Sequence, residues 1–139
     1  MAAMTTAWAP AQVAAVAAAA GMAGIALFQL GIALGAPLGQ AAWGGAHAGK
    51  LPTGLRIASG VAVLVWTCAA LVVLRRGGLG LHATPEAVAR WGVWILFGLL
   101  LLGALMNAAS SSAWERYLWA PYALIVSGLC FLAAVGDWT

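Results

Sequence analysis

The chain has 139 residues, of which 65% are hydrophobic and 6% are charged, with six Lys and Arg against three Asp and Glu. A soluble domain carries about 25% charged residues, so this composition excludes a water-soluble globular protein and indicates that lipid covers most of the surface. The net charge of +3 comes from scattered residues that flank apolar runs. Because a nucleic-acid-binding protein needs a continuous basic stripe, we expect no nucleic-acid partner.

Four apolar runs are long enough to cross a bilayer, which takes about 20 residues each. They cover residues 11–34, 55–74, 91–109 and 117–136. Together they account for most of the chain, which predicts a single integral membrane domain over residues 1–139. The expected fold is all-α, an antiparallel transmembrane four-helix bundle in the lipid bilayer of a cell membrane.

The first run, 11–34, is predicted to be a retained span and not a cleaved signal peptide. No Lys or Arg precedes it, and it stays apolar for longer than the roughly 7–15 residues of a signal-peptide core. Gly31, Gly35 and Gly39 recur at a spacing of four. This pattern lets membrane helices approach closely, so these glycines are expected to form a helix contact.

The connection "GAPLGQAAWGGAHAGKLPTGLRIAS", residues 35–59, is long for a protein of this size. Connections of this length in a compact domain are usually either functional or loosely ordered. At its end, Arg56 and Ser59 are three residues apart and therefore share one helical face. Asn107 and Ser110 have the same spacing where the third run ends.

The stretch "SSSAWERYLWAP", residues 110–121, has a structural interpretation. Ser112 and Glu115 fit the capping box S-x-x-E, which begins a helix. Aromatic residues gather at membrane interfaces, and the expected aromatic belt here comprises Trp114, Tyr117, Trp119 and Tyr122.

The alternative interpretation is a ligand site, since polar and ionisable groups at membrane depth are candidates for function. Gln29, within the first run, adds an amide where an unpaired polar group is costly. We expect Glu115 to pair with Arg56 or Arg116, with Arg56 favoured because the second and fourth runs start from the same side. The predicted ligand site comprises Trp43, Arg56, Ser59, Asn107, Ser110, Glu115, Arg116 and Trp119.

Lys and Arg are biased toward the cytoplasmic side of membrane proteins. The two ends of the bundle carry three each, Arg75, Arg76 and Arg90 at one end and Lys50, Arg56 and Arg116 at the other. We expect the arginines at helix starts, Arg56 and Arg116, to be partly buried and paired, whereas Arg75 and Arg76 end a long apolar run abruptly. This contrast predicts that both termini are cytoplasmic and that the predicted site faces outward.

No metal ligand set, cofactor motif or catalytic constellation is recognisable, so the catalytic residues, if any, are unknown. His47 and His82 are predicted to lie on opposite sides of the membrane and belong to no cluster with metal-ligand spacing. Cys68 and Cys130 are expected at similar depth but lack CxxC spacing. We expect both cysteines to serve in packing.

In the stretches "GAPLGQAAWGG", "LPTGLRIAS" and "NAASSSAWERYLWAP", the chain resembles small four-span integral membrane proteins of unknown function from GC-rich bacteria. The resemblance implies a four-span fold in the bacterial inner membrane and no particular reaction.

Three classes of function follow from these observations. The first is binding or transport of a small apolar or amphipathic ligand at the polar cluster near the outer face. The second is an accessory or scaffold subunit, with a membrane protein or a second copy of the chain as its partner. The third is a membrane enzyme acting on a lipid-soluble substrate, with Glu115 as its acid or base.

Overall fold

The computed structural model describes residues 8–80 and 82–136 and shows only helices and their connections there. Helices α1, α2 and α3 cover Pro10–Ala33, Thr53–Arg76 and Glu86–Ala108. The fourth span begins with a π-helical segment, η3 (Glu115–Trp119), and continues as α4 (Ala120–Val135). All four described spans are long and apolar enough to cross a membrane. The all-α, four-span fold is confirmed, and it fits a small polytopic membrane protein.

The helix boundaries differ most from the sequence prediction at the start of α3. Hydropathy predicts the third span from residue 91, whereas Thr84, followed by Pro85 and Glu86, predicts an earlier helix start with Thr84 as the N-cap residue. The helix begins at Glu86, with Pro85 as its N-cap residue, which is within one residue of the second prediction. The charge of Arg90 interrupts the apolar run without interrupting the helix. Proline and an acidic residue are both favourable in the first turn, so the helix extends beyond the segment that hydropathy identifies.

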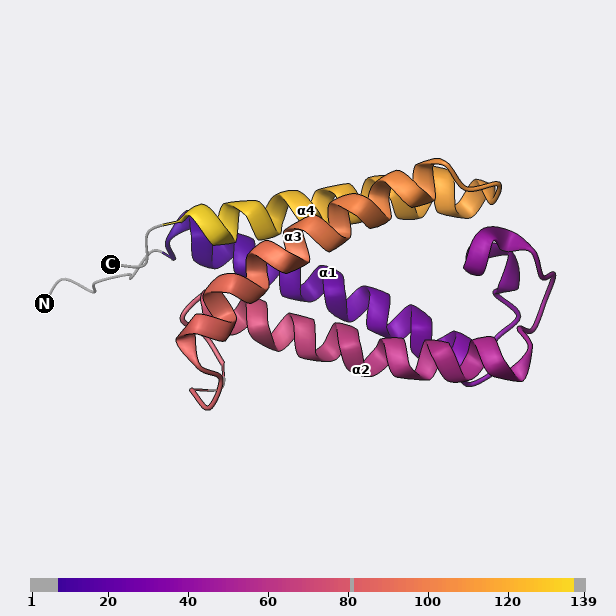
Figure 1. The fold of residues 1–139 in the computed structure, drawn as a ribbon, viewed down its shortest axis with the longest axis horizontal. Coiled ribbons are helices and arrows are strands. Elements are labelled where there is room, and N and C mark those ends of the chain that lie inside the picture. Colours follow the sequence, from indigo (N-terminus) through magenta and orange to yellow (C-terminus); the bar gives the residue numbers. More distant parts are fainter. Residues whose placement is uncertain (1–7, 81, 137–139) are drawn as a thin grey trace, which may run out of the picture.

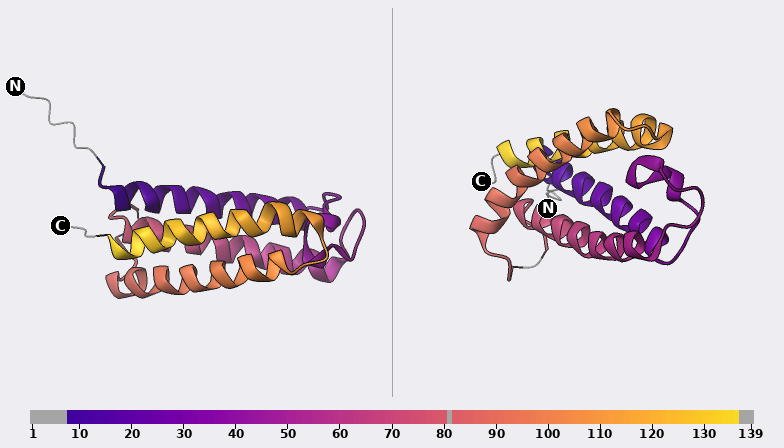
Figure 2. Two further views of the ribbon diagram at one scale, coloured as in Figure 1. Left: turned by 90° about the horizontal axis from the view of Figure 1, so that it is seen from above. Right: turned by 45° about the vertical axis from the view of Figure 1, so that its right-hand side comes forward.

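The four helices form two antiparallel hairpins, α1 with α2 and α3 with α4 (Figure 1). The hairpins converge at the end where α1 begins and α4 ends, and they diverge toward the connection between α1 and α2. Both further views show the same helices running alongside one another (Figure 2). The bundle is therefore tightly closed at one end and splayed at the other.

The main core lies where the hairpins converge. Small and medium-sized side chains from all four helices fill it, which permits close helix packing in a membrane. Its fully or almost fully buried members include Ala15, Ala18, Met22, Val73, Val93, Leu100, Cys130 and Ala133.

Helix α1 approaches α4 closely at Gly21 and Gly24. A Cβ atom at Gly21 would lie 2.6 Å from Cγ2 of Val126, and one at Gly24 would lie 2.5 Å from the hydroxyl oxygen of Tyr122. The same hydroxyl donates a 2.6 Å hydrogen bond to the Gly21 carbonyl oxygen. The absence of a side chain at both glycines is therefore what lets the two helices meet.

The predicted glycine contact at Gly31, Gly35 and Gly39 is wrong. A Cβ atom at Gly31 would make only ordinary contacts at 3.9 Å, and Gly35 has a φ of +100° beyond the end of α1. Gly39 lies against the backbone of the connection, at the carbonyl groups of His47 and Gly49. The four-residue spacing runs through the helix end, so the three glycines do not share one helical face.

The two cysteines occupy different environments. Cys130 is fully buried in the core, as expected of a packing residue, whereas Cys68 is exposed on the outside of the bundle. Both thiols are free. The expectation of a packing role within the bundle therefore holds for Cys130 and is wrong for Cys68.

The connection between α1 and α2 is anchored in the mouth of the splayed end. It contains two short 3-10 turns, η1 (Gly39–Ala41) and η2 (Trp43–Gly45). A second apolar cluster holds it, with Ile32, Ala42 and Leu51 buried against Phe28 and Leu55. The connection is therefore not loosely ordered, and its function stays a prediction.

Candidate functional site

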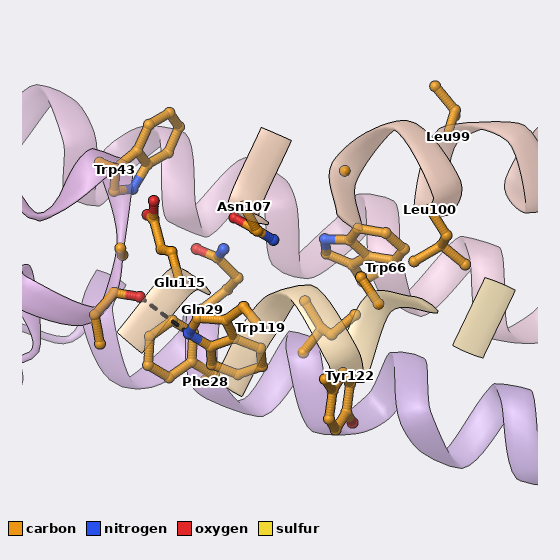
Figure 3. A pocket seen from close by; sticks show the side chains of 15 residues that line it. Phe28, Gln29, Trp43, Trp66, Leu99, Leu100, Asn107, Glu115, Trp119 and Tyr122 are labelled. Atoms are coloured by element: carbon orange, nitrogen blue, oxygen red, sulfur yellow. Dashed lines mark hydrogen bonds between the residues drawn. The ribbon is translucent and has the colours of Figure 1, made fainter. Parts of the chain in front are cut away.

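A cavity of about 280 Å³ lies between the two hairpins on the side of the bundle where they diverge. All four spans and the α1–α2 connection line it (Figure 3). Its polar side chains are those of Gln29, Asn107 and Glu115, and its aromatic rings are those of Phe28, Trp43, Trp66, Trp119 and Tyr122.

Glu115 joins the start of the fourth span to the connection. Its side chain is only 8% exposed. The carboxylate accepts a 2.8 Å hydrogen bond from the Gly44 backbone N–H and another from the Ser110 hydroxyl. A parallel link runs through Ser112, whose hydroxyl donates to the Gln40 carbonyl oxygen at 2.6 Å. The carboxylate therefore holds the η2 turn over the cavity.

The predicted capping box forms only in part. The Glu115 backbone N–H donates to Ser112 Oγ at 3.3 Å, which is one half of the motif. The reciprocal bond is replaced, because the Ser112 backbone N–H donates to Ser110 Oγ at 3.1 Å. The carboxylate is thus released from a local capping role and bonds to the connection.

The predicted ion pair between Arg56 and Glu115 is wrong. Arg56 donates instead to the Ala33 carbonyl oxygen, from Nε at 3.2 Å and from Nη2 at 3.0 Å. The last carbonyl groups of a helix lack intrahelical partners and attract cations, and Ala33 is the last residue of α1. Arg116 donates to the Ser110 carbonyl oxygen at 2.7 Å. Within the described residues, neither arginine pairs with the Glu115 carboxylate.

The contrast expected between the arginines of the two ends is not observed either. Arg75 Nε donates to the Thr84 carbonyl oxygen at 3.1 Å, and Arg76 Nη2 donates to the Ala134 carbonyl oxygen at 3.0 Å. Backbone carbonyl groups at helix ends and in connections therefore bind arginines at both ends of the bundle.

The π-helical segment η3 turns Glu115 and Trp119 toward the cavity together. The Ala120 N–H bonds to the Glu115 carbonyl oxygen, one residue further back than in an α-helix. Pro121 follows directly and has no N–H to donate to the preceding turn. Such π-turns are rare and occur frequently at functional sites.

The predicted aromatic belt divides into two pairs. Trp114 and Tyr117 are 55% and 74% exposed, as expected at a membrane interface. Trp119 and Tyr122 are half-buried and line the cavity. The ring centroid of Trp119 lies 4.5 Å from that of Phe28 and 5.5 Å from that of Tyr122. The outer pair therefore stays a predicted interfacial belt, whereas the inner pair contributes to the cavity.

Three of the aromatic residues donate hydrogen bonds from their polar groups to protein acceptors, so only their ring atoms remain to contact a molecule in the cavity. These bonds run from Trp119 Nε1 to the Ala41 carbonyl oxygen (3.0 Å), from the Tyr122 hydroxyl to the Gly21 carbonyl oxygen (2.6 Å) and from Trp43 Nε1 to Ser59 Oγ (3.3 Å).

The backbone of Trp43 is strained where it meets the cavity. Its φ of 55° is in the left-handed region, which non-glycine residues rarely adopt. Gly44 and Gly45, which follow it, also have positive φ values. Strained backbone of this kind persists only where surrounding contacts hold it, commonly at ligand sites. Here the contacts are the Trp43–Ser59 and Gly44–Glu115 hydrogen bonds.

Gln29 offers the cavity an acceptor that the protein leaves unused. Its Oε1 atom is buried and has no hydrogen-bond partner among the described residues. The side chains of Gln29, Asn107 and Glu115 point toward a common region (Figure 3). Because a buried acceptor without a partner costs about 1–3 kcal/mol, this arrangement suits a site completed by a donor from outside the chain.

No protein-family model matches the chain, and no curated protein or solved structure matches it. The site is therefore interpreted from its own residues. Of the residues predicted from sequence, the cavity-lining ones are Trp43, Asn107, Glu115 and Trp119. The others surround or anchor these, with Ser59 and Ser110 as direct hydrogen-bond partners and Arg56 and Arg116 on backbone carbonyl groups.

The sequence prediction missed Phe28 and Trp66 as cavity residues. A signal for Trp66 was present, because it follows Ser59 by seven residues and so lies on the same helical face. Phe28 is adjacent to Gln29, the one amide in the first span that the cavity uses. Each missed aromatic residue is therefore close in sequence to a polar residue that the prediction singled out, Trp66 to Ser59 and Phe28 to Gln29.

The cavity wall includes a residue on the outer surface of α3. Leu99, which lines it, is 56% exposed. Helices α2 and α3 are in close contact further along, where a Cβ atom at Gly92 would lie 2.8 Å from Cγ1 of Val72. From that point they diverge toward the splayed end (Figure 1). Leu99 therefore forms part of the cavity wall and part of the outer surface of the bundle.

Proposed function

We propose that the protein binds a small amphipathic molecule in the cavity between its two hairpins. The observation that carries this proposal is the buried, unpartnered Gln29 Oε1 atom beside an aromatic-lined space of about 280 Å³. Pockets for small molecules are typically about 300–1,000 Å³, mostly apolar, with a few convergent polar groups. This cavity is at the small end of that range, which favours a compact ligand.

The lining divides the expected ligand into two parts. Gln29, Asn107 and Glu115 surround one region, and the rings and aliphatic side chains, including Trp66 and Leu100, line the rest. A polar head group fits the first region and an apolar body the second. The exposed margin at Leu99 favours access from the bilayer over access through the anchored connection.

Filling the cavity should weaken this binding. A Cβ atom at Gly103, which lines the cavity, would meet no atom within 4 Å. Gly103→Leu should therefore fold normally, since leucine favours a helix more than glycine does, and should weaken binding by about tenfold or more through steric exclusion. Binding is measured by titrating benzyl alcohol, a small amphipathic probe, and following tryptophan fluorescence and thermal stability in mild detergent.

Gly98→Leu is the matched control. Gly98 is on the same helix, a Cβ atom there also meets open space, and the residue is exposed outside the cavity. The control should bind the probe as the unmodified protein does. If the unmodified protein and both variants bind the probe equally, the probe is in the detergent or on the protein surface, and the proposed site is refuted.

The proposed orientation places both termini in the cytoplasm of a bacterial cell and the cavity in the outer half of the inner membrane. Arg75, Arg76 and Arg90 lie around one short connection, whereas the other basic residues are divided between two connections. Short cytoplasmic connections rich in arginine support this orientation.

Reporter fusions test the orientation. A fusion at Thr139, which lies outside the described residues, should report the cytoplasm, and a fusion beside His47 should report the outer side. If both fusions give the opposite result, the orientation is reversed. The cavity then lies in the inner half of the membrane and is lined by the same residues.

A further inference from the structure

We infer that the head group of the ligand is an organic cation, held between the Glu115 carboxylate and the aromatic rings of the cavity. This inference rests on the proposed function, because it assigns the charge of the molecule that the cavity binds. Three observations carry it: the charge of the site, the direction of its polar groups and the ring surfaces.

Glu115 gives the cavity a carboxylate that no basic side chain of the described chain neutralises. Its two bonds come from the Gly44 N–H and the Ser110 hydroxyl, both neutral donors. The nearby arginines, Arg56 and Arg116, bond to backbone carbonyl oxygens. A buried carboxylate is costly unless it is paired, so a cationic ligand would supply the missing charge.

The polar groups of the cavity include an acceptor without a partner and a carboxylate. Gln29 Oε1 is buried without a partner, and a carboxylate has more lone pairs than the two that the Glu115 bonds use. The N–H groups of Trp43 and Trp119 are engaged elsewhere by protein acceptors. Donors are present as well, since the Trp66 indole N–H bonds to no other described residue. An anionic head group would nevertheless be repelled by the Glu115 carboxylate, which argues against that class.

The ring surfaces complete the cation site. Five aromatic side chains line the cavity. Trp119 packs against Phe28 and Tyr122, at centroid distances of 4.5 and 5.5 Å, whereas Trp66 makes no ring contact with another described residue. The face of an aromatic ring is electronegative and attracts ammonium groups, most strongly in desolvated sites and most strongly of all on tryptophan. A neutral alcohol would use the acceptors but would gain nothing from the ring faces.

The test compares two probes of the same shape that differ in charge. Benzyltrimethylammonium carries a quaternary nitrogen, and neopentylbenzene has carbon in its place. Equilibrium binding is measured by calorimetry in one mild detergent for the unmodified protein, Glu115→Gln and Glu86→Gln. Glu86 is an exposed carboxylate at the opposite end of α3 and serves as the control. Comparing variants removes the partition of each probe into detergent, which is the same for all of them.

The cation should bind the unmodified protein and the Glu86→Gln control with roughly tenfold higher affinity than it binds Glu115→Gln. The neutral probe should bind all three equally. If Glu115→Gln does not fold, Trp66→Leu supplies the second test, because Trp66 makes no side-chain hydrogen bond to another described residue and leucine keeps the wall apolar. That variant should lose affinity for the cation and keep its affinity for the neutral probe.

Two results would overturn the inference, and they differ in what else they refute. If the neutral probe binds and loses affinity in Gly103→Leu, while the cation binds Glu115→Gln and Trp66→Leu as well as the unmodified protein, the cavity takes neutral ligands and the proposed function stands. If neither probe binds more tightly to the unmodified protein than to Gly103→Leu, the proposed function fails together with the inference.

Discussion

Replacing Glu115 with leucine is expected to destabilise the protein by about 2–4 kcal/mol, because two hydrogen bonds to a buried carboxylate are lost together. The Gly44 N–H and the Ser110 hydroxyl would both lose their acceptor. Gly44 is near the strained backbone of Trp43, so the η2 turn should detach from the mouth of the cavity. Thermal unfolding in detergent measures the loss, and proteolysis within residues 39–45 should become faster.

The conservative variant separates a hydrogen-bonding role from simple packing. Glu115→Gln keeps one side-chain oxygen as an acceptor and should cost about 1 kcal/mol or less. Equal destabilisation by leucine and glutamine would show that the negative charge of Glu115, and not its acceptor geometry, holds the turn.

A double-mutant cycle with Arg56→Gln tests the corrected partner assignment. Arg56 bonds to the Ala33 carbonyl oxygen and shares no hydrogen-bond partner with Glu115. The effects of Glu115→Gln and Arg56→Gln should therefore add to within about 0.5 kcal/mol. A coupling energy above about 1 kcal/mol would show that Arg56 and Glu115 interact as an ion pair, in contradiction to the structure.

The four spans could be predicted from the sequence because membrane insertion depends on the length and hydropathy of a run, and both are local properties. The α3 start at Glu86 shows the limit of this method. A helix can continue past a charged residue such as Arg90 into the membrane interface, where the hydropathy of the sequence no longer identifies it.

The polar part of the site could be predicted because polar residues are rare in this chain and therefore conspicuous. Glu115 and Asn107 stood out for that reason, and both line the cavity. Phe28 and Trp66 did not, since an aromatic residue within an apolar run gives no contrast in composition. Whether such a ring faces lipid or a cavity depends on how the two hairpins diverge, which is a property of the tertiary structure.

The partner of Arg56 could not be predicted for a different reason. Sequence reasoning paired it with Glu115, the nearest available side chain of opposite charge. The acceptor is instead the Ala33 carbonyl group, and every residue carries such a group. Only the position of a helix end shows which carbonyl group lacks a partner.

Gly24→Ala is expected to destabilise the bundle by about 1–2 kcal/mol, because overpacking and the disturbance of a partly buried hydrogen bond outweigh the gain in helix propensity. The new Cβ atom would lie 2.5 Å from the Tyr122 hydroxyl oxygen and would displace it from the Gly21 carbonyl oxygen. Gly31→Ala is the matched control, since its Cβ atom would make only 3.9 Å contacts. That change should be neutral or stabilising by up to about 1 kcal/mol, because alanine favours a helix over glycine.

The Tyr122→Phe background shows whether the hydroxyl group is the cause. Without that hydroxyl, the next atom of residue 122 from a Cβ at Gly24 is Cζ, at an ordinary distance of 3.6 Å. Tyr122→Phe alone should lower the free energy of unfolding by about 1 kcal/mol, because one hydrogen bond is lost. In that background, Gly24→Ala should cause little further destabilisation. The double variant should therefore be more stable in thermal unfolding than Gly24→Ala alone. If Gly24→Ala costs as much in the Tyr122→Phe background as in the unmodified protein, the contact that limits the approach of α1 to α4 lies elsewhere, and Gly21 against Val126 becomes the determining pair.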